Sequence, residues 1–188
     1  MISKKAIISK NAKIGKGTII WHNTQVRENT EIGEYCIIGK DCYIDKNVKI
    51  GNKVKVQNSS NIYSGTIIQD EVFIGPNVNI TNDKFPRATN IDGSLKKDGD
   101  WTLENVLIEK GSSIGASSTI TPGITIHQFA MVGSGSVVTK DIPKYGLVVG
   151  NPARLVGYIC RCGKKLSHTI NKKIYKCKYC GLLINLDK

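Results

Sequence analysis

A period of six residues runs through most of this chain. From Ile2 to Ile80 every sixth residue is Ile or Val, and a second such run extends from Ile108 to Val138. An amphipathic helix repeats its apolar face every 3.6 residues and a half-exposed strand every two, so neither pattern fits. A hexapeptide period rich in β-branched residues predicts a parallel β-helix, in which three short strands form one coil and successive coils stack.

Two further columns accompany the aliphatic one. Small or β-branched residues recur four positions after each aliphatic residue, and Cys36 and Cys42 belong to this column. We therefore expect both cysteines in the core. Gly recurs directly after the aliphatic residue, as at Gly33 and Gly75. We expect these glycines at corners where the chain turns tightly with positive φ.

Composition and charge limit the classes of protein. No apolar run reaches the ~20 residues of a membrane span, and the N-terminal segment has no signal-like apolar stretch. We therefore expect a cytoplasmic chain without membrane insertion. The net charge is +12, and eight Lys or Arg residues against one Asp lie from Gly157 onward. This charge indicates anionic partners, either phosphorylated small molecules or nucleic acid; a solvated lysine-rich surface is the alternative.

The period loses its phase after Ile80. It resumes at Ile108, which is not a whole number of hexapeptides away, and the intervening segment contains Pro86, Gly93 and Gly99. This composition predicts a loop, at about residues 82–105, that leaves the β-helix. Long loops in compact domains are often functional, although a tolerated surface insertion is the alternative.

Polar residues form a column beside this loop. Residues 18 apart stack on successive coils, so counting back from Thr81 gives Tyr63, Asp45 and Arg27, and the column ends at Asn82. Hydrogen-bonding side chains that replace corner glycines next to a loop predict a ligand site. A ladder of satisfied, solvent-facing side chains is the alternative.

The C-terminal tail carries four cysteines in two close pairs. Cys160 and Cys162 are separated by one residue, Cys177 and Cys180 by two, and a Gly follows each pair. Two thiol pairs on a predicted hairpin match a structural zinc site, with a disulfide as the alternative. The pattern predicts two domains, a β-helix at residues 1–156 and a zinc-ribbon-like tail at residues 157–188.

Several segments together resemble one branch of the hexapeptide-repeat acetyltransferases. They are similar to the UDP-2-acetamido-3-amino-2,3-dideoxyglucuronate and the dTDP-3-amino-3,6-dideoxyhexose N-acetyltransferases, which acetylate the 3-amino group of nucleotide-linked sugars. The segments are WHNTQV (21–26), VQNSSNIY (56–63), FIGPNVNITNDKFPRA (73–88), IGASSTITPGITI (114–126) and residues 137–166, which contain GNPAR.

The resemblance implies an all-β fold, a left-handed parallel β-helix assembled as a homotrimer. It further implies acetyl-CoA bound between neighbouring subunits, a nucleotide-sugar substrate under the loop, and a role in polysaccharide precursor synthesis. Asn82 matches the residue that contacts the reacting groups. The candidate substrate-binding residues are His22, Arg27, Asn58, Tyr63, Asp83 and Arg87. The candidate acetyl-CoA-binding residues are Gly133, Ser134, Lys140, Lys144, Asn151, Pro152 and Arg154.

The sequence does not decide which group accepts the proton from the attacking amine. Many hexapeptide acyltransferases use a His, whereas the 3-amino-sugar branch resembles enzymes in which the departing CoA sulfur takes the proton. His127 follows Ile126 at a corner and is either a catalytic base or an exposed corner residue. Two alternatives remain: an acetyltransferase for another amine or hydroxyl that uses His127, and a noncatalytic scaffold whose ribbon binds protein or nucleic acid. The scarcity of aromatic residues in the tail disfavours nucleic-acid binding.

Overall fold

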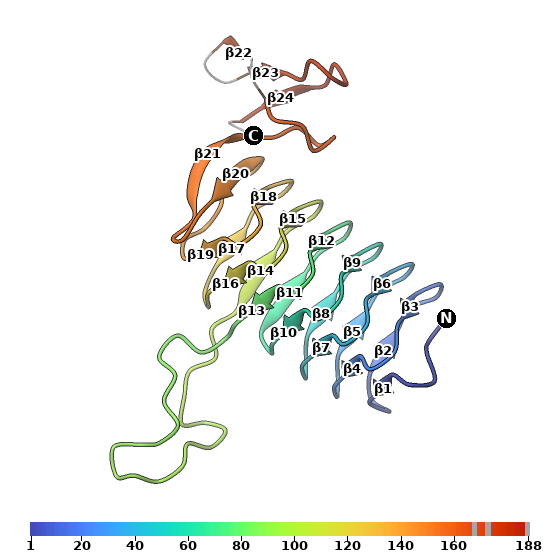
Figure 1. Cartoon of the computed structure of the whole chain (residues 1–188), viewed down its shortest axis with the longest axis vertical. Helices are drawn as coiled ribbons and strands as arrows, with labels where there is room; N and C mark the ends of the chain where they lie inside the picture. Colours follow the sequence, from blue (N-terminus) through green and yellow to red (C-terminus); the bar gives the residue numbers. More distant parts are fainter. Residues whose placement is uncertain (167–168, 172–173, 187–188) are drawn as a thin grey trace.

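The fold is an all-β solenoid built from coils of three short strands, as the period of six predicts (Figure 1). The structure, a computed structural model, describes residues 1–166, 169–171 and 174–186. His168 and the tail lysines Lys172, Lys173 and Lys188 lie outside the described residues. The part of the chain that is described forms no helix long and apolar enough to cross a membrane.

Three parallel sheets form the sides of the solenoid. The seven-stranded sheet contains β1 (Ile7–Ile8), β4 (Gln25–Val26), β7 (Tyr43–Ile44), β10 (Asn61–Ile62), β13 (Asn79–Ile80), β16 (Thr119–Ile120) and β19 (Val137–Val138). The six-stranded sheet contains β2 (Lys13–Ile14), β5 (Glu31–Ile32), β8 (Lys49–Ile50), β11 (Thr66–Ile68), β14 (Val106–Ile108) and β17 (Thr125–Ile126). The eight-stranded sheet contains β3 (Ile19–Ile20), β6 (Ile37–Ile38), β9 (Lys55–Val56), β12 (Phe73–Ile74), β15 (Ser113–Ile114), β18 (Met131–Val132), β20 (Gly146–Val149) and β21 (Arg154–Tyr158).

The corners between these sheets run along the solenoid as three edges. We call the corners that follow the seven-stranded sheet the loop edge, those that follow the six-stranded sheet the second edge, and those that follow the eight-stranded sheet the third edge. Strands of one sheet pair residues 18 positions apart, for example Asn61 with Asn79. Each edge therefore carries columns of residues spaced by one coil, about 4.8 Å.

The core is the aliphatic column together with the column of small residues. Ile44, Ile62 and Ile80 are fully buried, and so are Cys36 and Cys42, which confirms the two cysteines as core residues. The Cys42 thiol donates to the Gln57 carbonyl, with 3.1 Å between sulfur and oxygen. The small-residue column thus satisfies corner carbonyls of the next coil without bringing water into the core.

The conformational role expected for the corner glycines is wrong. Positive φ occurs two residues further along the chain, at Tyr35 (55°) after Gly33 and at Asn77 (57°) after Gly75. Gly33 and Gly75 themselves do not have positive φ. At Gly75 a Cβ atom would lie 2.7 Å from the Ala116 backbone nitrogen. These positions therefore exclude side chains because consecutive coils stack too closely.

The solenoid is interrupted between β13 and β14 by an excursion, residues 81–105, that projects from the loop edge (Figure 1). After it, β13 pairs with β16 and joins Asn79 to Thr119, so the stacking continues as if the excursion were absent. A bridge between Asp83 and Leu103 closes the root of the excursion.

The last coil carries the C-terminal tail. β21 pairs antiparallel with β20 and leads into a three-stranded antiparallel sheet of β22 (Thr169–Asn171), β23 (Ile174–Lys176) and β24 (Leu183–Asn185). Tyr145 of the last coil packs on the small apolar cluster of the tail. The Arg161 guanidinium lies 4.4 Å from the ring centre of Phe129, which stacks on Tyr145. The tail is therefore docked on the end of the solenoid.

Close stacking at the glycine corners predicts a stability effect. Gly75→Ala should destabilise the fold by about 1–3 kcal/mol, because the new methyl group would overlap backbone atoms that cannot rotate away. Gln57→Ala is the matched control, since Gln57 occupies the same column one coil earlier and already has a Cβ. Thermal unfolding monitored by circular dichroism measures both variants. Equal melting temperatures would contradict the packing role of Gly75.

Candidate functional site

A hollow of about 380 Å³ lies where the excursion meets the loop edge. Asn82 lines it, one residue after the last regular corner position. Asn82 Nδ2 donates to the Ser64 carbonyl at 3.2 Å, which orients the amide and leaves Oδ1 as an acceptor. The hollow is lined by Arg27, Asp45, Lys46, Ser64, Asn82, Asp98, Gly99, Trp101 and Leu103.

Asp45 is the buried carboxylate of this site. Its Oδ1 accepts from the Lys46 amide (2.8 Å) and the Tyr43 hydroxyl (3.0 Å), and its Oδ2 accepts from the Ser64 hydroxyl (3.1 Å). Burial raises the pKa of Asp45, but the amides of Lys46 and Ser64 and the two hydroxyls outweigh it, so the pKa is lowered. Asp45 is therefore ionised at neutral pH and ties two coils together.

Arg27 belongs to the same site but is already paired. Its guanidinium contacts Glu28 at 2.7 Å and Asp45 at 3.3 Å. The Lys46 ammonium, in contrast, pairs with the exposed carboxylate of Asp98 on the excursion, at 3.1 Å. Within the described ion pairs, Lys46 is thus the cation of this hollow with the weaker and more exposed partner.

His22 and Asn58 lie in a different hollow, on the third edge. This hollow measures about 280 Å³ and also contains Trp21 and Gln57. The Trp21 and His22 rings meet edge to face at 6.0 Å. Tyr63, on the loop edge, packs against Tyr43 with 5.7 Å between ring centres. The structure therefore separates the candidate substrate residues into two groups on different edges.

The remaining substrate candidates lie on the excursion. Asp83 accepts from the Phe85 amide at 2.9 Å and thereby shapes the turn at the root of the excursion. Arg87 is exposed and donates to the Pro86 carbonyl at 2.8 Å. Arg87 does not line the hollow that contains Asn82.

His127 lies on the second edge, away from the corners that carry Asn82 and His22. Its Nδ1 is 3.3 Å from Glu109 Oε2, and the Gln128 amide donates to the same oxygen at 3.0 Å. The carboxylate is thus fixed by the backbone and orients the imidazole. Such a pair can present Nε2 as a general base. A partly exposed ion pair without a catalytic role would have the same geometry.

The candidate acetyl-CoA residues cluster toward the C-terminal end of the solenoid. The Gly133 amide donates to the Val148 carbonyl at 2.8 Å, so it is not available to a thioester oxygen within this chain. Ser134 is exposed beside it on the third edge. Lys144 lies 5.7 Å from the Tyr145 ring centre. The other members are Lys140, Asn151 and Pro152, which are exposed, and Arg154, at the start of β21.

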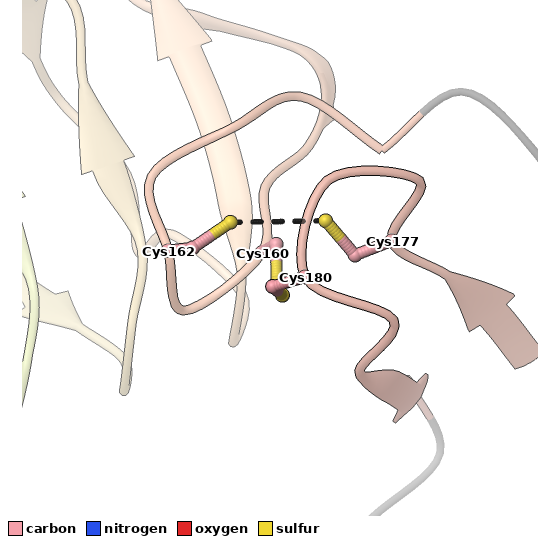
Figure 2. A group of neighbouring side chains, drawn as sticks. All are labelled: Cys160, Cys162, Cys177 and Cys180. Atoms are coloured by element: carbon pink, nitrogen blue, oxygen red, sulfur yellow. Dashed lines mark hydrogen bonds between the residues drawn. The ribbon is translucent and has the colours of Figure 1, made fainter.

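The four tail cysteines come together in one cluster (Figure 2). Their sulfur atoms all lie within 4.8 Å of one another; Cys160 and Cys180 are 3.5 Å apart, and Cys162 and Cys177 are 3.7 Å apart. The amides of Cys180 and Tyr179 lower the pKa of Cys177 to about 6, whereas burial raises that of Cys160 to about 12.

Each cysteine pair sits in a tight turn closed by a glycine. The Gly163 amide donates to the Cys160 carbonyl at 2.8 Å, and the Gly181 amide donates to the Cys177 carbonyl at 2.9 Å. Both glycines have positive φ, 82° and 74°, which disfavours any other residue there. Two matching turns thus present four thiols toward one centre.

Several residues that line or support these sites were not among the sequence-based candidates, among them Ser64, Lys46, Glu109 and Trp101. Ser64 and Lys46 lie 18 and 36 positions before Asn82, in the column next to that of Arg27, so the same count started from Asn82 reaches them. Glu109 lies 18 positions before His127, and the same count would pair them. Trp101 had no such signal, because the excursion has no period.

Two models of hexapeptide-repeat proteins match the chain. The model of the bacterial transferase hexapeptide matches residues 11–46 and 47–82. The model of the hexapeptide repeat of succinyl-transferase matches residues 29–64 and 105–140. Together they cover more than half of the chain, which belongs to the hexapeptide-repeat transferase family.

Individual relatives match over shorter segments. The dTDP-3-amino-3,6-dideoxy-alpha-D-galactopyranose 3-N-acetyltransferase of Aneurinibacillus thermoaerophilus is 52% identical over 71 residues, which cover 38% of this chain and 37% of that protein. The galactoside O-acetyltransferase of Escherichia coli K12 is 35% identical over 89 residues, 47% of this chain and 42% of that protein. The chain thus spans less than half the length of either relative.

A solved structure agrees in fold. A mutant of AntD, an N-acyltransferase from Bacillus cereus in complex with dTDP and coenzyme A, superposes with a TM-score of 0.51 and 20% sequence identity. The match covers 86% of this chain and 81% of AntD. At this identity the likeness concerns the fold.

The buried carboxylate predicts an effect of pH on stability. Asp45→Asn should lower the melting temperature at pH 7, because an amide nitrogen would face the donors that surround Asp45. The folded-state pKa of Asp45 is lowered, so its stabilisation is present above the unfolded pKa of about 4 and is lost as pH falls below it. The variant should therefore lose less stability than the wild type between pH 7 and pH 3.

The exposed carboxylate of Asp98 provides the control for this prediction. Asp98→Asn should change the melting temperature little, because exposed ion pairs contribute about 0–1 kcal/mol. Parallel melts of the three proteins at pH 7 and pH 3 make the comparison. An Asp45→Asn protein with the wild-type pH dependence would contradict the assignment.

Proposed function

We propose that this chain transfers acetyl from acetyl-CoA to the 3-amino group of a UDP- or dTDP-linked amino sugar. The local identity of 52% to a dTDP-3-amino-sugar 3-N-acetyltransferase supports this substrate class. The orientation of Asn82 at the junction of solenoid and excursion supports the site. The product would be a nucleotide-linked acetamido sugar, a precursor for polysaccharide or glycan synthesis in the cytoplasm.

The chemistry is a direct attack in a ternary complex. The neutral amine donates an N–H to Asn82 Oδ1, which holds the nitrogen lone pair toward the thioester carbonyl. The new C–N bond forms, the C–S bond breaks, and the departing CoA sulfur takes the proton released by the amine. A neutral amide suits this role because, unlike a carboxylic acid, it does not protonate the nucleophile.

The cosubstrate would lie toward the C-terminal end of the solenoid. Arg154, Lys140 and Lys144 would meet the phosphates of acetyl-CoA, with the Asn151–Pro152 turn beside them. Since the Gly133 amide is engaged, the Ser134 amide is the better candidate donor to the thioester oxygen.

We further propose that the protein is a homotrimer with a left-handed coil and active sites between subunits. Asn82 and His22 lie on different edges of one chain, so a neighbouring subunit could bring one group to the other. Outward-facing apolar residues of the eight-stranded sheet, among them Ile37 and Phe73, offer a surface for such contact.

A second candidate function follows from His127. The contact between Glu109 and the imidazole favours a general base that activates another small amine or a hydroxyl. The match to a galactoside O-acetyltransferase makes a hydroxyl acceptor a concrete alternative.

An assay with a panel of UDP- and dTDP-linked 3-amino sugars and a galactoside tests both candidates. The protein and acetyl-CoA are mixed with each sugar, and thiol release is followed together with the mass of the product. Asn82→Ala should reduce kcat/KM at least about tenfold, whereas Asn79→Ala, on the outer face of β13, should retain activity. His127→Ala should retain activity under the first proposal and lose it under the second.

The outcomes of this assay are distinct. Normal turnover by Asn82→Ala would refute the role of Asn82. Acetylation of a galactoside but of no amino sugar, with loss in His127→Ala, would favour the second function. No turnover with any acceptor would favour a noncatalytic scaffold.

We also propose that the four tail cysteines hold a structural zinc ion. Tetrahedral thiolate ligation at about 2.3 Å requires sulfur atoms about 3.8 Å apart, and the observed separations of 3.5 and 3.7 Å fit. Zinc would supply folding free energy to a tail whose apolar cluster, among the described residues, has four buried members, two of them the ligands Cys160 and Cys177.

Removal of one cysteine tests the zinc site. Cys177→Ser should lose bound zinc and lower the melting temperature of the tail, because three ligands close the site poorly. Cys42→Ser is the control, since its hydroxyl can still donate to the Gln57 carbonyl and its position lies in the solenoid core. Metal content by plasma mass spectrometry should be one zinc per chain in wild type and control. Absence of zinc from the wild type would refute the proposal.

A further inference from the structure

The hollow at the loop edge is the end of a longer groove. A second hollow of about 320 Å³ adjoins it and shares Lys46, Ser64 and Leu103 with it. Of these two hollows, Asn82 lines the first and Lys49 the second. The groove therefore leads from a neutral amide toward two lysines.

The coil spacing sets the length scale of this groove. Asn82, Ser64 and Lys46 belong to one column, so Lys46 lies two coils, about 10 Å, from Asn82. The excursion runs back along the same direction, because Leu103 pairs with Asp83 beside Asn82 while Asp98 contacts Lys46. Trp101 lies between these two contacts in sequence and lines the same hollow.

The order of groups along the groove matches one kind of ligand. A 3-amino hexopyranose bears its amine and its anomeric oxygen on different parts of one ring. The diphosphate of a nucleotide sugar starts at that anomeric oxygen. An amine at Asn82 thus places the sugar ring beside Trp101 and directs the diphosphate toward Lys46, within two coil spacings, about 10 Å.

Trp101 has the properties of a platform for a sugar ring. The C–H bonds of a pyranose are weakly positive and stack on the negative face of an aromatic ring. Trp101 is partly buried, and its indole stacks on no aromatic ring of the described residues. Phe85, another aromatic residue of the excursion, is 76% exposed and does not line this hollow, although it shares a neighbouring hollow with Trp101.

Lys46 has the properties of an exchangeable diphosphate contact. The side chain of its partner Asp98 is 88% exposed. Breaking this ion pair therefore costs little free energy, because the carboxylate is already almost fully hydrated. A diphosphate carries more negative charge than one carboxylate and can replace it. Arg27, held by Glu28 and Asp45, is less free to change partners.

We propose that this groove binds the hexopyranose diphosphate part of the substrate, with Trp101 as the platform for the sugar ring and Lys46 as the cation for the diphosphate. Asp98 is paired with Lys46 until the diphosphate of the ligand displaces the carboxylate. The inference rests on the proposed function, since it takes the amine at Asn82 as its starting point. It adds two binding residues to the proposed site. It also predicts that the nucleobase of the sugar nucleotide lies outside the groove.

The two tryptophans allow a direct binding test. Trp21 lies in the third-edge hollow and Trp101 in the groove, so Trp21→Phe leaves Trp101 as the sole indole. Titration of this variant with dTDP-glucose or UDP-N-acetylglucosamine should change its emission saturably. UDP or dTDP alone should change it less, because neither carries a hexopyranose on its diphosphate.

Calorimetry on further variants gives the energetic test. Trp101→Ala should weaken binding of either sugar nucleotide about tenfold, Trp101→Phe should restore most of it, and Phe85→Ala should match the wild type. Lys46→Met should weaken the binding of sugar nucleotides and of free nucleotides to the same degree. Equal affinity of Trp101→Ala and wild type, or no binding of any sugar nucleotide to the wild type, would overturn the groove assignment.

The acetyl-transfer assay separates this inference from the proposed function. In an active enzyme, Trp101→Ala should raise KM for the amino sugar and leave KM for acetyl-CoA unchanged. Acetyl transfer that Trp101→Ala does not alter would refute the groove and leave the activity standing. Sugar nucleotide binding that depends on Trp101, without acetylation of any acceptor, would refute the activity and retain the groove.

Discussion

Close parallel stacking of the coils is the constraint on which this structure depends. Strands of the regular coils pair with residues 18 positions away, and strands on either side of the excursion stack in the same way, so side chains repeat in columns along three sides and three edges. The interior admits only aliphatic and small residues, and several corners admit only glycine because neighbouring backbones nearly touch. Chemistry is thus confined to the edges, where a column can carry polar groups without disturbing the core.

The excursion converts one of these edges into a site. A bare edge is a convex surface, and columns such as Arg27–Asp45 would be ordinary solvent-facing ladders. Residues 81–105 supply the opposite wall, which encloses Asn82, Lys46 and Trp101 in one hollow. The solenoid resumes its register afterwards, so the excursion adds this wall without loss of stacking.

The tail uses a different source of order. Its apolar cluster is small, and four thiols converge between two glycine-closed turns in place of a larger core. It is attached to the solenoid through Tyr145 and through Arg161, which lies over the Phe129 ring. The end of the solenoid that carries the candidate acetyl-CoA residues is therefore also the end on which the tail rests.

The period of six was enough to predict the solenoid, its core cysteines and the column from Arg27 to Thr81 beside Asn82, because stacking makes position in the sequence equivalent to position on an edge. The same count also contained Ser64, Lys46 and the Glu109–His127 pair. It could not predict Trp101 or Asp98, since the path of an aperiodic excursion depends on tertiary contacts. The reason for the corner glycines was also hidden, because a tight turn and a close approach select the same residue. Only the tertiary structure distinguishes the two causes, since it shows that the backbone of the next coil lies where a Cβ atom would be.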